Sequence, residues 1–294
     1  MTILQILVAA RWVHFAALFV LFGCPLSVLL TCGAKDAARI FPATDRLLRA
    51  AAVVAAISGL AWIATLIANM TGGFAEAASP DTLDAFFFAT QFGPVVIIRL
   101  ILLAAALLAM ILPRQLRFKA WLLIGALLLL DQAWLGHAAN GGANPAGAMM
   151  IAAYAVHVLA GAAWVGGFPV LLFALLAREP CDNAAVLSRY SLLATAAVVL
   201  ILLSGIANAL FRVQGHIARF AATEYGEILL VKLLLVALML ALACYNRFIA
   251  LPRLGAAKRQ PIASGLAGSI GAELALGILV IGAAALLGIT PPPN

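Results

Sequence analysis

Long runs of apolar residues, separated by short polar or glycine- and proline-rich connections, dominate the pattern of this sequence. Runs such as 120–130 and 194–203 are almost continuously apolar and lack the two-residue alternation of strands in an outer-membrane barrel. A helix needs about 20 apolar residues to cross a bilayer. This criterion predicts eight membrane-spanning helices, at roughly 4–30, 47–69, 93–112, 119–137, 148–176, 190–211, 226–250 and 265–289.

The composition supports an all-α, polytopic transmembrane bundle in a lipid bilayer. Hydrophobic residues make up 66% of the chain and charged residues 10%, against about 45–50% and about 25% in soluble domains. A water-soluble fold, a disordered chain and a disulfide-stapled secreted module are therefore excluded. The net charge of +7 could suggest nucleic-acid binding, but no basic and aromatic patch accompanies it. Basic residues in a membrane protein usually mark cytoplasmic loops, so no nucleic-acid partner is predicted.

The distribution of basic residues predicts the orientation of the chain. Of the 18 lysines and arginines, 13 lie in the connections after spans one, three, five and seven, whereas two lie on the other side. Cytoplasmic connections are enriched in these residues. We therefore predict a multi-pass protein of the bacterial inner membrane with both termini in the periplasm. The first apolar run is too long for a signal peptide and no A-x-A cleavage site follows it.

Short matches in the same order along the chain predict an internal duplication. Ser58-Gly59-Leu60-Ala61 corresponds to Ser204-Gly205-Ile206-Ala207, and His14 and His157 are each followed nine residues later by glycine and then by proline. An even number of spans keeps both halves in one orientation. The sequence thus predicts a 4+4 parallel repeat in one integral membrane domain, with halves at 1–140 and 141–294.

The histidines are the candidate metal ligands. His14, His137 and His157 lie in the outer half of the predicted bundle, and imidazole suits copper, zinc, iron or nickel. Met149 and Met150 open the fifth span, and thioethers favour Cu(I). The alternative is structural: a neutral histidine hydrogen-bonded inside the bundle, and methionines that fill the membrane interior. The remaining histidine, His216, is interpreted as a solvated loop residue.

Charged residues inside the membrane are costly, so each needs a partner or a function. Arg99 and Asp131 lie at similar depth, which predicts an ion pair between spans three and four; proton or ion passage is the alternative. Lys232 and Glu273 are their counterparts in the second half, but the sequence leaves the partner of Glu273 open. Arg11 either extends toward the outer surface or faces an acid.

Span five contains a segment of small residues and a proline, Trp164-Val165-Gly166-Gly167-Phe168-Pro169. Close helix packing with a kink explains Trp164, Gly166, Gly167 and Pro169; the alternative is a kink that opens the core beside His157. The four cysteines fall in the inner half or the cytoplasmic loops, where disulfides are not expected.

Several of these motifs together resemble the copper resistance protein D family of bacterial inner-membrane proteins. They include Arg11-x-x-His14, Gly136-His137-Ala138, His157 with Trp164-x-Gly166-Gly167, and Glu273 in the last span. The resemblance implies eight spans and copper transfer from the periplasm across the inner membrane. It also implies a periplasmic copper-binding partner of the CopC type, here as a separate chain. Histidines outside, where copper arrives, and thiols inside, where Cu(I) is held, fit this role.

Two other functions remain open at this point. The first is electron transfer through b-type haem, with His14 and His157 as axial ligands. The second is a membrane anchor whose polar residues are purely structural. No phosphate-binding loop, H-E-x-x-H or C-x-x-C motif is present, so no enzyme is predicted, although a redox role stays open. The sequence does not indicate the oligomeric state or the direction of transport.

Overall fold

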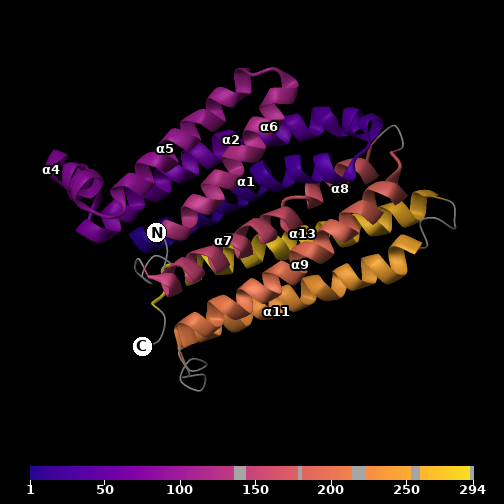
Figure 1. Cartoon of the computed structure of the whole chain (residues 1–294). Coiled ribbons are helices and arrows are strands. Elements are labelled where there is room, and N and C mark those ends of the chain that lie inside the picture. The colour runs from indigo at the N-terminus through magenta and orange to yellow at the C-terminus, as the bar shows by residue number, and fades with distance from the viewer. Residues whose placement is uncertain (136–143, 178–180, 214–222, 253–258, 292–294) are drawn as a thin grey trace.

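The protein is a bundle of long helices, shown in Figure 1. The computed structural model describes residues 1–135, 144–177, 181–213, 223–252 and 259–291. Within these residues the chain is helical and has no strand. The long helices are α1 (Ile3–Thr31), α2 (Ala34–Thr71), α5 (Gly93–Leu108), α6 (Arg114–Asp131), α7 (Pro145–Val165), α8 (Phe168–Leu175), α9 (Asn183–Val213), α11 (Glu224–Tyr245) and α13 (Arg259–Leu287).

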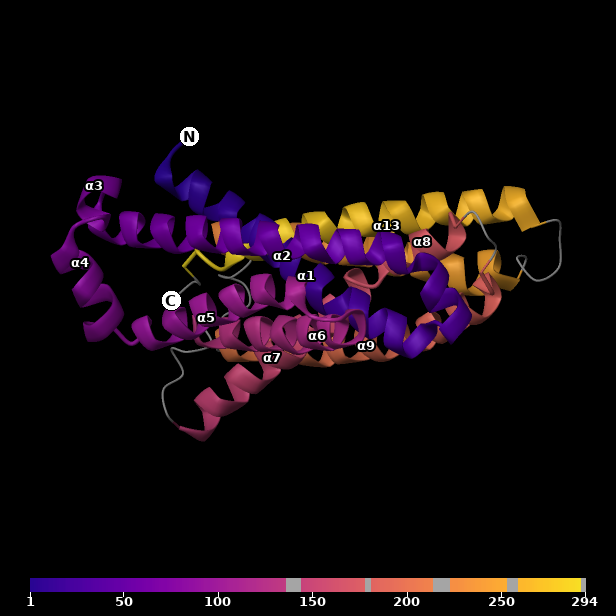
Figure 2. The ribbon, with the colours of Figure 1, turned by 90° about the horizontal axis from the view of Figure 1, so that it is seen from above.

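Short helical segments complete the described part. They are α3 (Phe74–Ala77), α4 (Pro80–Asp84), η1 (Ala85–Ala89), η2 (Ala109–Ile111), η3 (Gln132–Trp134) and η5 (Asn246–Ala250). The first three lie between α2 and α5 and form an excursion beyond the end of α2, which Figure 2 shows from above. The others extend α5, α6 and α11.

Each predicted span corresponds to a helix, but some helices begin or end at residues outside the apolar run that predicted them. α2 begins at Ala34 rather than near residue 47, because its first turns carry polar residues beyond the apolar run. Seven helical stretches in the described residues are long and apolar enough to cross a membrane. The predicted span 119–137 corresponds to α6, which is not among the seven because Arg114, Arg117, Lys119 and Asp131 interrupt its apolar character.

α1 is the central helix of the bundle. It packs against α2, α6, α7, α8, α9 and α13, and Leu18, Leu21 and Cys24 along it are completely buried. The beginning of α1 and the end of α13 lie at the same end of the bundle (Figure 1), where the Arg11 guanidinium lies against Gly288. We call this the terminal end, and the other the distal end.

The glycine-proline segment of span five breaks the helix and brings two helices into close contact. α7 ends at Val165 and α8 begins at Phe168, because Pro169 has no N–H to continue the hydrogen-bond ladder. Gly166 faces Gly23 of α1, and a side chain at either glycine would overlap backbone atoms of the opposite helix. The predicted kink and close packing are both present, and Trp164 and Phe168 are buried beside them.

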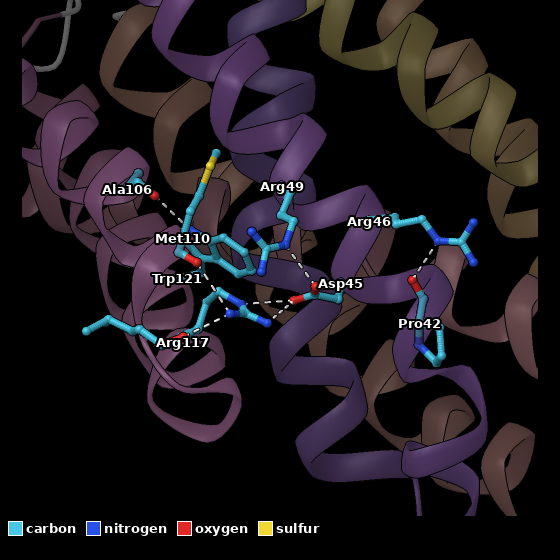
Figure 3. Close-up of polar contacts among 9 residues, drawn as sticks. Pro42, Asp45, Arg46, Arg49, Ala106, Met110, Arg117 and Trp121 are labelled. Carbon is cyan, nitrogen blue, oxygen red and sulfur yellow. Dashed lines mark hydrogen bonds and ion pairs between the residues drawn. The ribbon is translucent and has the colours of Figure 1, made fainter.

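An ion-pair cluster ties α2 to the connection between α5 and α6 at the distal end (Figure 3). Arg117 donates to Asp45 Oδ1 from Nε at 2.9 Å and from Nη2 at 2.8 Å, and its Nη1 donates to the Leu112 carbonyl at 2.8 Å. Arg49 donates to Asp45 Oδ2 at 2.9 Å. Arg117 therefore hydrogen-bonds to the Leu112 carbonyl at the end of η2 and links this connection to Asp45 on α2.

Replacing Asp45 by alanine should destabilise the protein more than replacing Arg49 by alanine. Asp45→Ala leaves the buried Arg117 without its carboxylate, a loss of about 1–3 kcal/mol. Arg49→Ala removes an i,i+4 pair whose arginine is 40% exposed, which is worth about 0.5 kcal/mol or less. Thermal unfolding of the two purified variants in detergent measures the difference, and equal midpoints would contradict this assignment.

Candidate functional site

His14 lies completely buried in the half of the bundle near the terminal end, with both ring nitrogens hydrogen-bonded. Its Nε2 is 2.9 Å from Arg99 Nη1, and its Nδ1 is 2.9 Å from the Ala55 carbonyl oxygen. Arginine can only donate, so Nε2 accepts and the ring proton resides on Nδ1, which donates to Ala55. In this arrangement neither nitrogen of His14 is available to a metal ion.

Arg99 connects four elements of the first half. Its Nε donates to Asp131 Oδ2 at 2.8 Å, which is the predicted ion pair between α5 and α6. Its Nη2 donates to the Leu128 carbonyl at 3.2 Å and to Gln132 Oε1 at 3.1 Å. The guanidinium also lies 4.7 Å from the centre of the Trp62 ring on α2. A fully buried arginine is thus satisfied by a carboxylate, an imidazole, an amide and a carbonyl.

Arg11 adds a second positive charge to this region. Its guanidinium lies 5.5 Å from the Trp62 ring and 5.6 Å from the Phe15 ring, and it is buried rather than extended to the surface. The buried donors Arg11 Nε, Trp62 Nε1 and Gln132 Nε2 have no hydrogen-bond partner. Two guanidiniums and one carboxylate leave the surroundings of His14 positively charged and rich in donors. Such surroundings oppose a copper cation at His14 while Arg99 remains in place.

His157 on α7 occupies the corresponding position in the second half, with a different set of contacts. Its Nδ1 lies 3.2 Å from the Ile201 carbonyl and 3.1 Å from Ser204 Oγ. Ser204 donates its own proton to the Leu200 carbonyl, so its oxygen accepts from Nδ1–H. This tautomer makes Nε2 the nitrogen with the lone pair, which is the form of imidazole that binds metals.

The two histidine environments repeat one local design. Ser58 donates to the Val54 carbonyl as Ser204 does to that of Leu200. The carbonyl that receives His14, that of Ala55, lies three residues before Ser58, and Ile201 lies three residues before Ser204. The rings of His14 and His157 lie against Gly59 and Gly205, respectively. Helix pairs α1–α2 and α7–α9 thus hold their histidines in the same way.

The other predicted ligands are distributed unequally. Met149 is exposed near the start of α7, and Met150 is half-buried two turns before His157. His137 lies outside the described residues, as does His216. Among the residues that the structure describes, no group of three or more His, Cys, Asp or Glu side chains is placed to hold a metal ion.

Glu273 lies in a second buried polar cluster, toward the distal end of the second half. It accepts a hydrogen bond from Asn246 Nδ2, and both residues line a cavity of about 60 Å³ with Tyr190, which donates to the Trp164 carbonyl. The buried atoms Asn246 Oδ1 and Ser269 Oγ have no partner. The cavity is mostly apolar, and Glu273 and Asn246 supply polar groups on its wall. No sequence pattern indicated that Asn246 or Tyr190 belongs to this cluster.

The fold and these clusters define a polytopic helical membrane protein in which Arg11, Arg99, Asp131 and Glu273 are buried inside the bundle, whereas Lys232 on α11 is half-buried. The chain belongs to the copper resistance protein D family: residues 1–148 match the model "Copper resistance protein D-like, N-terminal domain", and residues 184–287 match "Copper resistance protein D". The predicted family is therefore confirmed. No solved structure matches the chain.

Three curated relatives extend this assignment. The chain is 31% identical to the inner membrane protein YebZ of Escherichia coli, over 84% of this chain and 85% of the relative. It is 27% identical to copper resistance protein D of Pseudomonas syringae, over 97% of this chain and 96% of the relative. It is 31% identical to the copper transport protein CutJ of Bacillus subtilis, over 77% of this chain but 42% of that longer relative.

Proposed function

We propose that this protein moves copper from the periplasm across the inner membrane, with His157 as the principal ligand on the outer side. Relatives named for copper resistance and copper transport align with most of the chain, and these names support copper as the cargo. The tautomer of His157 makes Nε2 the acceptor nitrogen, as in His14, and the choice between the two is carried by Arg99, which donates to Nε2 of His14 and brings a positive charge to it. His137 and Met150 are the proposed further ligands on the route to it.

We further propose eight crossings, with α6 as the eighth span. The contact of Arg11 with Gly288 brings the first and last spans to one end, which requires an even number of crossings. The 18 residues of α6 rise about 27 Å, close to the hydrocarbon thickness of about 30 Å, and its one mid-bundle charge, Asp131, is neutralised by Arg99. The positive-inside rule supports a periplasmic position for the terminal end in this proposal.

The repeated histidine geometry supports the proposed 4+4 repeat and assigns the two halves different tasks. Nε2 is the acceptor nitrogen of both histidines, but at His14 it accepts from the cationic Arg99, whose charge opposes a copper ion there. Copper can reach His14 only after Arg99 has moved, so His14 is a secondary ligand in this proposal. With both its nitrogens hydrogen-bonded, His14 gives the bis-histidine haem hypothesis no support. The activity is transport rather than catalysis, and a separate CopC-type protein supplies the copper.

Replacing His157 by alanine should lower copper affinity by at least about tenfold. Loss of a residue that only hydrogen-bonds to a metal ligand already costs about 10–100-fold, so loss of a ligand should cost no less. Copper titration of the purified protein, followed by elemental analysis after desalting, measures this loss. Met149→Leu and Met150→Leu form a matched pair. The exposed Met149 should have no effect, whereas Met150, on the same face as His157, should contribute. Wild-type copper binding by His157→Ala would refute the site.

A further inference from the structure

Two cysteines from distant parts of the sequence lie on neighbouring connections at the distal end. Cys32 lies between α1 and α2, and Cys181 lies between α8 and α9. Asp36 joins the two connections, because its Oδ1 accepts from the Asp182 backbone N–H at 3.2 Å. The two thiols lie at this junction, each close enough to Asp36, and to the other, for an electrostatic interaction.

The surroundings of this pair are suited to hold a negatively charged metal complex. Arg189 donates to the Thr31 carbonyl at 3.3 Å beside Cys32. Arg39 forms an ion pair with Asp36 at 3.7 Å and lies near Cys181. Asp36 is compensated by Arg39 and by the Asp182 N–H, which leaves Arg189 to offset the single negative charge of a Cu(I) complex with two thiolates. Both arginines favour the deprotonated form of the cysteine beside them.

The exposure and the protonation of the two thiols also fit a site in which an incoming metal ion displaces the thiol protons. Both cysteines are unpaired thiols; Cys181 is buried and Cys32 half-buried, so one side of the pair faces the surface. Burial raises the pKa of both thiols above their ordinary value. They are therefore protonated at neutral pH until a metal ion displaces the protons.

We propose that Cys32 and Cys181 form a two-coordinate Cu(I) site at the cytoplasmic end of the transport route. This inference rests on the proposed function for its direction. One Cu⁺ replaces two S–H protons, two Cu–S bonds form, and both protons pass to water, so the complex carries one negative charge and no electron is transferred. Soft thiolates select Cu(I). Zn²⁺ requires four ligands in a structural site, and the described residues offer no third ligand here.

The test is a Cu(I) titration of the purified full-length protein in detergent, under argon with a reductant and with bathocuproine disulfonate as the competing chelator. Cys32→Ser and Cys181→Ser should each lower Cu(I) affinity at least tenfold, and the double variant should lose one bound Cu(I). Cys244→Ser is the matched control, because this cysteine is exposed and lies on α11, outside the two connections that carry the pair, and it should bind like the wild type. Affinity should rise about a hundredfold per pH unit, since two protons leave.

Failure of the thiol site and failure of the proposed function can be distinguished. In His157→Ala the thiol-dependent Cu(I) should remain, and X-ray absorption should show two sulfur neighbours; loss of transport with this binding intact would leave the thiol site standing. Undiminished Cu(I) binding by the double variant would overturn the proposal. So would a Cys32–Cys181 disulfide formed on mild oxidation, identified by mass spectrometry, in a protein that binds no thiol-dependent Cu(I) when reduced.

Discussion

Replacing Arg99 by methionine is expected to destabilise the protein by about 3–5 kcal/mol, the range for breaking one partner out of a buried ion pair. The change leaves the Asp131 carboxylate at the core of the bundle without its cation, and it removes the donors to His14 Nε2 and Gln132 Oε1. Arg99→Lys should be intermediate, because lysine keeps the charge but not the planar fork. Thermal unfolding in detergent, followed by the fraction of monodisperse protein, measures the loss.

A double variant separates charge imbalance from a simple loss of contacts. In Arg99→Met combined with Asp131→Leu both members of the ion pair are gone and Asp131 no longer leaves an unpaired carboxylate, so stability should recover most of the way toward the wild type. The double variant also lacks the donor to His14 Nε2. If His14 is a secondary copper ligand, copper binding should therefore rise in this variant. A double variant no more stable than Arg99→Met would contradict the ion pair as the principal contribution.

The fold was predictable because lipid imposes a simple rule on the sequence. Spanning segments must be helical and long, so apolar runs located α1 and α5 to within a few residues at both ends, whereas α9 begins seven residues before its predicted start. The rule fails where a helix continues into water, as at the start of α2. It also overlooks the break after Val165, since an apolar run does not reveal where the hydrogen-bond ladder is interrupted. Pro169 was the available signal.

The candidate site was predictable only in part. The depth of a residue in the membrane can be counted along its helix, but the neighbouring helix toward which its side chain points cannot. Equal depth was enough to pair Arg99 with Asp131. It could not show that Arg99 also occupies His14 Nε2, which depends on the rotation of three helices. The same limit hid the Asn246 partner of Glu273. The proximity of the connections that carry Cys32 and Cys181 could not be predicted, because nothing in either local sequence indicates that Asp36 accepts a hydrogen bond from Asp182.

Gly166 is the position where the smallest change should have a large effect. α7 and α1 touch through backbone at this point: a β-carbon at Gly166 would overlap the Phe19 carbonyl oxygen, and one at Gly23 would overlap the Ala162 carbonyl oxygen. Neither obstacle is the flexible end of a side chain, so the helices must move apart. Membrane helices associate largely through such close packing by small residues. Gly166→Ala should therefore cost at least about 1–3 kcal/mol, the usual penalty for overpacking.

Gly161→Ala is the matched control for this expectation. It lies on the same helix and faces the same α1 residue, but its β-carbon would stand 3.5 Å from the Phe19 ring, which is an ordinary contact. Alanine is also the better helix former by about 1 kcal/mol, so this variant should be as stable as the wild type or more stable. Unfolding midpoints of the two variants in detergent decide the matter. Because Cys24 donates to the Gly166 carbonyl, the thiol reactivity of Cys24 should rise in Gly166→Ala alone. Equal midpoints with unchanged Cys24 reactivity would show that α1 and α7 are not held by this contact.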